Sequence, residues 1–511
     1  MNYADLFLAT LPETVLEIAA LLVLVVDLGL LRNASGATRI NVGSLLGVLG
    51  CGLSLLMIPL QPRGGFSVAG VGDLMLAGGG AATIAQAGIL VLTVLTLFLL
   101  IDTRFTRNPA EYVAVVLMAA TGGMLISAAQ DLLVIFIGLE LLSLGLYILT
   151  AFAKSSGKSA EAAMKYFLFG GMSAAFLLFG FSFLYGFSGS TSLQRIAQSA
   201  YSARAIHAAP LLYVALVMVA AGLSFKIAAA PFHLWAPDAY EGAPATGAAF
   251  IASVSKVASF ALLISIGAAL IHTVRPAEGY FIISGNEVPR WIGLRGPWSV
   301  TLTLVSVASM VIGNLVALAQ TSVRRLLAYS TVAHAGYILL GLVFFSYGFL
   351  SQNAILYYAL TYGLTTVGAF GVVGVVERAT GSDKMDAFSG LYKRNSLMAG
   401  VLLVLFLSLA GIPPLVGFWA KFNLFAAVLR FNHSGLVMGL VALAVAMSAV
   451  SLFFYLQVLK RAYVTAPVEE SPIKAHPVTM GVLLLIAAGV VLLGCFPALL
   501  QGWMTSFYVG M

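Results

Sequence analysis

The feature that most constrains the fold is a series of long apolar runs with almost no charge. One of them, FLFGGMSAAFLLFGFSFLYGFSG at residues 167–189, has no charged residue. A helix needs about 20 mostly apolar residues to cross a bilayer. Only 9% of the whole chain is charged, whereas soluble domains carry about 25%. The sequence therefore predicts an integral membrane protein.

The apolar runs predict about fourteen membrane-spanning helices, joined by connections too short to hold a soluble domain. We expect the helices to begin near residues 11, 40, 83, 110, 131, 161, 208, 244, 298, 326, 351, 396, 435 and 475. The predicted fold class is an all-α polytopic membrane protein, with residues 1–511 as a single transmembrane domain.

The net charge of +7 could indicate a nucleic-acid partner, but the basic residues are scattered. Their densest groups are adjacent pairs such as Arg324-Arg325 and Lys393-Arg394, so we expect a lipid bilayer and no nucleic acid as partner. The odd-numbered loops carry more Lys and Arg than the even-numbered loops, which predicts that the odd loops are cytoplasmic. Both termini would then lie on the outer, periplasmic side.

Charged residues inside the spans need a separate explanation. Lys226, Lys256 and Lys421 lie in apolar runs, and Glu140 lies near the centre of another. Lys256 is about a dozen residues from either end of its span, roughly 18 Å along a helix, which is too far for its side chain to reach the interface. A central charge costs about 2.5–3.5 kcal/mol. Such residues are usually enclosed and functional, although a purely structural buried ion pair stays open.

A further charged pair, Glu161 and Lys165, lies at the predicted cytoplasmic start of the sixth span. An i, i+4 pair of opposite charges commonly stabilises a helix, which is one interpretation of these residues. The alternative interpretation is a role in transport.

The residue types favour protons over metal ions. Burial destabilises a charged ammonium or carboxylate, so such groups can change protonation state near neutral pH. A metal site would need clustered carboxylates and carbonyls, whereas this interior has more ammonium than carboxylate groups. Cys51 and Cys495 form no CxxC pattern, and no spacing predicts haem or iron–sulfur ligands. We expect no cofactor and no metal in this chain.

Prolines interrupt two spans close to interior lysines. Pro231 and Pro237 follow Lys226 in span 7, and Pro413-Pro414 precede Lys421 in span 12. Broken helices at matching places in two halves indicate an ion site in a transporter. Two inverted five-helix repeats, spans 4–8 and 9–13, would superpose the breaks. His334 lies in span 10, between the two halves, and its ordinary titration range suits a proton relay, although packing is an equal alternative.

Five segments together resemble a known family. They are IGLELLSLGLYIL, LSFKIAAAPFHLWAPDAYEGAP, SKVASF, RRLLAYSTVAHAGY and GIPPLVGFWAKF. The resemblance is to the antiporter-like, proton-conducting membrane subunits of NADH–quinone oxidoreductase (respiratory complex I), and most closely to the subunit N branch. Ala420 departs from the pattern, since the family often has glycine there.

The resemblance implies a proton channel built from two inverted half-channels with broken helices 7 and 12. It implies residues 1–105 as N-terminal spans, 110–272 as the first repeat, 298–461 as the second and 475–511 as the last span. The implied relay is Glu140, Lys226, Lys256, His334 and Lys421, with Glu161 and Lys165 as a further charged pair.

The resemblance also implies partners and a location. NADH, flavin, iron–sulfur clusters and quinone would be handled by other subunits of the complex, and other antiporter-like membrane subunits would be neighbours. The location would be the bacterial inner membrane, or the thylakoid membrane for a cyanobacterial or plastid chain. Two alternatives stay open: a subunit of a multi-subunit sodium/proton antiporter, and a non-conducting structural membrane scaffold.

Overall fold

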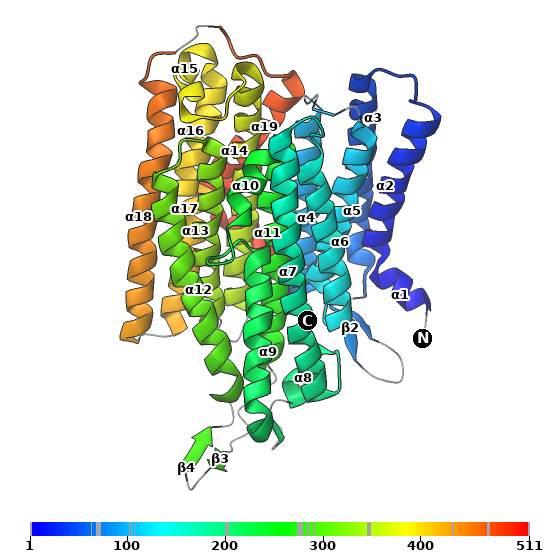
Figure 1. Ribbon diagram of the computed structural model, residues 1–511, viewed down its shortest axis with the longest axis vertical. Coiled ribbons are helices and arrows are strands. Elements are labelled where there is room, and N and C mark those ends of the chain that lie inside the picture. Colours follow the sequence, from blue (N-terminus) through cyan, green and yellow to red (C-terminus); the bar gives the residue numbers. More distant parts are fainter. Residues whose placement is uncertain are drawn as a thin grey trace.

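The chain forms one bundle in which the long helices run along a common axis (Figure 1). The structure is a computed structural model. It describes residues 3–62, 64–67, 73–101, 103, 105–106, 108–199, 204–272, 280–283, 286–289, 292–344, 349–431, 434–467 and 471–508.

The elements follow one another as helices with two short hairpins. The first part of the chain contains α1 (Tyr3–Ala9), α2 (Leu11–Gly29), α3 (Gly36–Met57), η1 (Ile58–Leu60), β1 (Phe66–Ser67), β2 (Leu74–Leu76) and α4 (Gly80–Leu100). Next come α5 (Pro109–Ala128), α6 (Leu132–Ala151), α7 (Gly157–Ser188), α8 (Leu193–Ser199), α9 (Arg204–Lys226), α10 (Trp235–Gly242) and α11 (Ala245–His272). After the hairpin β3 (Tyr280–Ile283) and β4 (Asn286–Pro289) come α12 (Ile292–Leu318), α13 (Val323–Val343) and α14 (Phe349–Thr380). The last part contains η2 (Met385–Phe388), α15 (Leu391–Arg394), α16 (Ser396–Ala410), α17 (Val416–Phe431), α18 (Gly435–Tyr463), α19 (Pro477–Cys495) and α20 (Pro497–Ser506).

The predicted fold class, an all-α polytopic membrane protein, is confirmed. Among the described residues, eleven helices are long and apolar enough to cross a membrane, and Pro210–Lys226 and Ser396–Ala410 are shorter apolar helices. The count of about fourteen spans stays a prediction. It includes the two broken helices and also α2, which carries Glu13, Glu17 and Asp27.

Two of the carboxylates in α2 are enclosed by polar partners. Asp27 forms an ion pair with Arg39 of α3, and Glu13 accepts a hydrogen bond of 2.8 Å from the Gln86 amide of α4. These contacts compensate for part of the cost of burying the two acids and fix α2 against its neighbours.

The helix that carries Lys256 is the most enclosed of the spans. In α11, 94% of the most apolar stretch is buried, against 28% in α18 and 33% in α7. α11 packs on α4, α5 and α14, so α11 is central, whereas α7 and α18 expose their side chains toward lipid. A charge in the middle of α11 is therefore enclosed by protein.

The two ends of the bundle differ. α8 and the β3–β4 hairpin lie at one end, and α15 lies at the other (Figure 1). The hairpin lies in the loop between α11, which ends at His272, and α12, which begins at Ile292. Residues 273–279, 284–285 and 290–291 of that loop lie outside the described part of the chain.

Cysteine labelling tests this arrangement. In a Cys495→Ser background, which removes the exposed native thiol, we expect Lys384→Cys and Gln198→Cys to react with a membrane-impermeant maleimide from opposite sides, because both side chains are exposed and lie at opposite ends of the bundle. The charge asymmetry predicts that Lys384→Cys reacts from the cytoplasmic side. Labelling of both cysteines from one side would contradict the fold.

Candidate functional site

The helix α9 stops inside the bundle. It ends at Lys226, and Ala228 two residues later has a left-handed φ of 58°. The Ala229 N–H then turns back to the Ser224 carbonyl at 2.8 Å. This closure ends the helix sharply and leaves its last carbonyl groups without helical donors. Pro231 lies just beyond, in the connection to α10.

The helix α16 stops in the same way. It ends at Ala410, and Gly411 has a φ of 89°. The Ile412 N–H donates back to the Leu407 carbonyl at 3.0 Å. Pro413-Pro414 then lead into α17. Both predicted breaks therefore present a helix C-terminus, with its partial negative charge, inside the bundle.

Lys256 meets the broken end of α9. Its Nζ donates to the Lys226 carbonyl at 3.1 Å, and the ammonium lies 5.2 Å from the centre of the Trp235 ring in α10. A free carbonyl and an aromatic face both attract a cation. The ammonium in the middle of α11 is thus held by the break in the neighbouring helix.

Lys421 meets the broken end of α16. Its Nζ donates to the carbonyl groups of Leu409 at 3.1 Å and Ala410 at 2.9 Å. A third hydrogen bond, of 2.7 Å, reaches the Ser448 hydroxyl of α18, and the Tyr337 ring centre lies 5.4 Å away. All three ammonium protons therefore have acceptors.

Lys226 has a different partner. Its Nζ donates to the Ser143 hydroxyl of α6 at 2.6 Å. Glu140 lies one turn earlier on α6, half-buried, and acts on the ammonium electrostatically, but these two side chains form no ion pair in this conformation. Lys226 is therefore placed next to a carboxylate without being bound to it.

His334 lies on α13, within the second predicted repeat. Its Nδ1 shares a hydrogen bond of 2.9 Å with the Tyr358 hydroxyl, and Nε2 has no partner. The Tyr362 ring lies 4.6 Å away between centroids. One turn before His334, Thr331 bonds the Tyr362 hydroxyl at 2.7 Å. A group of hydroxyls therefore surrounds the histidine.

These hydroxyl partners were absent from the sequence prediction. Tyr358 and Tyr362 lie four residues apart on α14, and Thr331 lies three residues before His334 on α13. Polar residues at such helical spacing share one face, which is the signal that could have found them. Ser143 carries the same signal, because it lies three residues after Glu140 on α6. Ser448 carries none that points to Lys421, because it lies on a different helix, α18.

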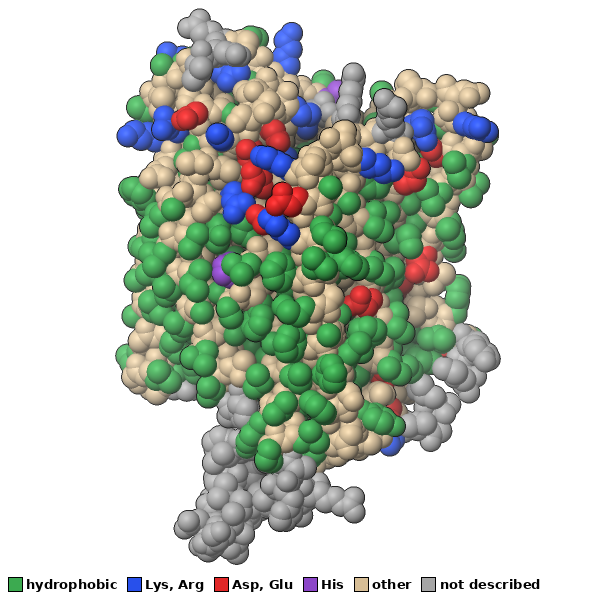
Figure 2. All heavy atoms as spheres, in the orientation of Figure 1, with side chains coloured by type: hydrophobic (Ala, Val, Ile, Leu, Met, Phe, Trp, Pro, Cys, Tyr) green, Lys and Arg blue, Asp and Glu red, His purple; other side chains and the backbone are tan. Residues whose placement is uncertain are grey.

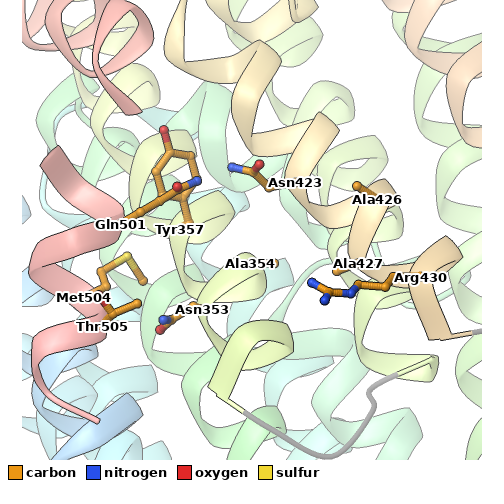
Figure 3. A pocket seen from close by; sticks show the side chains of 10 residues that line it. All are labelled: Asn353, Ala354, Tyr357, Asn423, Ala426, Ala427, Arg430, Gln501, Met504 and Thr505. Atoms are coloured by element: carbon orange, nitrogen blue, oxygen red, sulfur yellow. The ribbon is translucent and has the colours of Figure 1, made fainter. Parts of the chain in front are cut away.

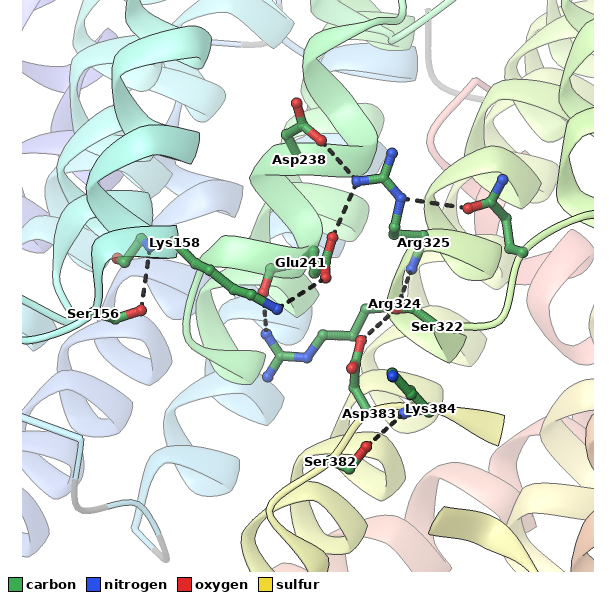
Figure 4. A network of polar contacts seen from close by, with 12 residues as sticks. Ser156, Lys158, Asp238, Glu241, Ser322, Arg324, Arg325, Ser382, Asp383 and Lys384 are labelled. Carbon is green, nitrogen blue, oxygen red and sulfur yellow. Dashed lines mark hydrogen bonds and ion pairs between the residues drawn. The ribbon is translucent and has the colours of Figure 1, made fainter. Parts of the chain in front are cut away.

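Lys226, Lys256, His334 and Lys421 are buried, and we call them the buried row. The structure places Glu161 and Lys165 apart from this row. Lys165 pairs with Glu161 at 2.7 Å and with Asp238 of α10 at 2.9 Å. Asp238 and Glu241 in turn bind Arg325 of α13, at 2.7 and 3.0 Å (Figure 4). The expected i, i+4 pair exists, and it belongs to an ion network joining α7, α10 and α13.

A second arginine extends this network. Arg324 donates to the carbonyl groups of Glu241 at 3.0 Å and Ala243 at 2.6 Å, and it pairs with Glu377 of α14. Pro237 lies in the first turn of α10, where a missing N–H costs no helical bond. The short helix α10 is therefore clamped to the second half of the chain by α13.

The buried groups suit proton transfer and offer no metal site. The exposed fractions are 8% for Lys226, 1% for Lys256, 4% for His334 and 6% for Lys421. Within the described residues, no group of three or more His, Cys, Asp or Glu could hold a metal ion. What the site brings together is a set of amines, an imidazole and hydroxyls that can carry protons.

The chain matches known proteins over nearly its whole length. Residues 129–448 match the family described as NADH:quinone oxidoreductase/Mrp antiporter, TM. The NADH-quinone oxidoreductase subunit N 2 of Acidobacterium capsulatum is 45% identical and is covered over 99% of each chain. The chain belongs to the NADH:quinone oxidoreductase/Mrp antiporter family.

Solved structures of this family share the fold. A chain of respiratory complex I from Thermus thermophilus with bound aureothin has a TM-score of 0.76 at 30% identity, covering 96% of this chain and 98% of that one. A chain of the Mrp complex from Dietzia sp. DQ12-45-1b has a TM-score of 0.79 at 20% identity, covering 97% and 96%. The second likeness shows the fold alone.

The left-handed backbone of Gly411 at the end of α16 predicts that alanine is unfavourable there. A Cβ there would lie 3.0 Å from Lys421 Cδ and 3.2 Å from its Nζ, on a left-handed backbone. We expect Gly411→Ala to lower the stability of the assembled subunit by about 1–2 kcal/mol and to impair proton pumping. Gly400→Ala is the control, because a Cβ there meets nothing within 4 Å. An alanine in place of glycine inside a helix raises stability by about 0.5–1 kcal/mol. Thermal aggregation and pumping by the purified complex are the measurements, and equal behaviour of the two variants would contradict this role of Gly411.

Proposed function

We propose that the chain is the subunit N component of an NADH–quinone oxidoreductase, and that it moves protons across the membrane while electrons pass from NADH to quinone in other subunits. The support is 45% identity over 99% of both chains with a protein named NADH-quinone oxidoreductase subunit N 2. The partners are the other membrane subunits of the complex. As in the sequence analysis, we expect this chain itself to hold no flavin, haem, iron–sulfur cluster or metal.

One observation supports a proton relay through the buried row. The ammonium groups of Lys226, Lys256 and Lys421 are held by carbonyl and hydroxyl oxygens, and no described carboxylate forms an ion pair with any of them. A carboxylate partner would hold the proton on the amine, whereas neutral partners let it leave. The relay consists of Glu140, Lys226, Lys256, His334 and Lys421.

The ends of α9 at Lys226 and of α16 at Ala410 support the division into two repeats. Residues 110–272 and 298–461 form the inverted halves, each with one broken helix and a buried ammonium at the break. Residues 1–105 and 475–511 are the flanking spans. The hydroxyl cluster around His334 (Thr331, Tyr358 and Tyr362) lies within the second half. The ion network of Lys165, Asp238 and Arg325 joins the two halves at the α15 end.

The charge distribution supports an orientation. Figure 2 shows Lys and Arg side chains gathered toward the end of the bundle that carries α15, beyond a belt of hydrophobic side chains. Because basic residues stay on the cytoplasmic side, the α15 end faces the cytoplasm and both termini face the periplasm. The membrane is the bacterial inner membrane.

The alternatives have weaker support. A sodium/proton antiporter subunit shares the fold, yet the identity to the Mrp chain is only 20%. A non-conducting scaffold would hold its interior charges in ion pairs, as Arg324 and Glu377 do near the α15 end. The three buried lysines have no such partner among the residues that the structure describes.

Substitution of Lys226 separates these functions. We expect Lys226→Ala to assemble but to lower proton pumping and quinone reductase activity together, by about ten-fold, because coupling free energies are reciprocal. Lys226→Arg is also impaired, since a guanidinium keeps its proton. The measurements are NADH–quinone turnover and proton uptake in membranes, with assembly followed on a native gel.

Lys460→Gln is the matched control, because this lysine is exposed on α18, and it keeps wild-type rates. A sodium/proton antiporter would lose sodium tolerance in Lys226→Ala with NADH oxidation unchanged. Wild-type pumping by an assembled Lys226→Arg complex would contradict the relay role of Lys226.

A further inference from the structure

A polar pocket lies between α14, α17 and α20, at the end of the bundle opposite α15. It has a volume of 280 Å³. Its polar lining comes from Asn353 and Tyr357 of α14, Asn423 and Arg430 of α17, and Gln501 of α20 (Figure 3). None of these residues belongs to the buried row of the proposed relay.

Several polar atoms of this pocket lack protein partners. Both amide atoms of Asn353, the Nδ2 of Asn423 and the hydroxyl of Tyr357 are buried without a hydrogen bond, and the Tyr357 side chain is 1% exposed. Buried polar atoms are normally satisfied. Apart from Asn353 Oδ1, which is an acceptor, these atoms are donors, so the set indicates a bound polar group that accepts hydrogen bonds.

Arg430 gives the pocket its charge. Its guanidinium extends into the same space as the amides (Figure 3), and no described carboxylate pairs with it. Guanidinium groups bind phosphate and carboxylate well because their N–H donors match two oxygens at once. An anion held by the guanidinium and the neighbouring amide donors would satisfy the donor atoms of the pocket, but not the acceptor Asn353 Oδ1.

An apolar pocket of 310 Å³ lies deeper along the same helix. It is lined by Val91 of α4, Leu360 and Leu364 of α14, Leu493 of α19 and Trp503 of α20. Along α14 the step from Asn353 to Leu364 is eleven residues, roughly 16 Å toward the middle of the bilayer. The helix α20 lines both pockets, the polar one with Gln501 and the apolar one with Trp503.

We propose that these two pockets form a binding site for an anionic phospholipid. Its phosphate lies against Arg430 and the amides, and an acyl chain lies along α20 in the apolar pocket. The order of the two pockets matches that of a lipid, with the charged group near the end of the bundle and the apolar group deeper in the membrane. The bound lipid would contact α20, α14 and α17 and hold these three helices together.

Photocrosslinking of the purified complex tests this site. The probe is phosphatidylglycerol with a diazirine in one acyl chain, and labelled peptides are mapped by mass spectrometry. We expect labelling of the segments around Leu360–Leu364 and Leu493–Trp503, competed by unlabelled phosphatidylglycerol. Arg430→Gln lowers the labelling about five-fold, the contribution of one basic residue near a lipid surface. Arg430→Lys retains most of it, and Lys460→Gln retains all of it.

Four outcomes would overturn the proposal. The first is labelling that is absent from these segments or unchanged in Arg430→Gln. The second is competition by decylubiquinone but not by phosphatidylglycerol, which would assign the pockets to a quinone. The third is loss of labelling on adding inorganic phosphate, which would assign the polar pocket to a free anion. The fourth is loss of assembly in Arg430→Gln with unchanged labelling of the assembled fraction, which would assign the pocket to a neighbouring subunit.

Discussion

The hydrogen bonds between buried ammonium groups and the ends of broken helices are the interactions on which the rest of the site depends. Lys256 and Lys421 each bind carbonyl groups that a continuous helix would have used internally. A central charge costs about 2.5–3.5 kcal/mol in a membrane, and a free carbonyl in hydrocarbon is also unfavourable. The hydrogen bond between the ammonium and the carbonyl lowers both costs. A buried lysine and a broken helix, each unfavourable alone, therefore stabilise one another.

This pairing has a consequence for function. Carbonyl and hydroxyl oxygens carry only partial negative charge, so the loss of a proton from the amine costs less free energy than it would in an ion pair with a carboxylate. Lys226 differs, because Glu140 lies near its ammonium while Ser143 binds it. Movement of the Lys226 side chain from Ser143 toward Glu140 would raise the affinity of the amine for a proton.

Much of the fold could be predicted from the sequence, and the site only in part. Apolar runs fix the spans because the bilayer sets their length, and the start expected near residue 396 matches Ser396. The buried lysines stand out because charge is rare in these runs. Their partners could not be predicted, since the Lys256 contact crosses from α11 to the end of α9, thirty residues away in the chain. The role of Asp238 in binding Lys165 and Arg325 likewise depends on how three helices meet.

If the ammonium groups at the two helix ends belong to one proton path, their effects on turnover must be coupled. The direct measurement is a double-mutant cycle of Lys256→Ala and Lys421→Ala on NADH–quinone turnover and proton uptake in assembled complexes. A single path predicts that the double variant retains as much activity as the more impaired single variant. Residual activities that multiply, as for independent sites, would contradict it.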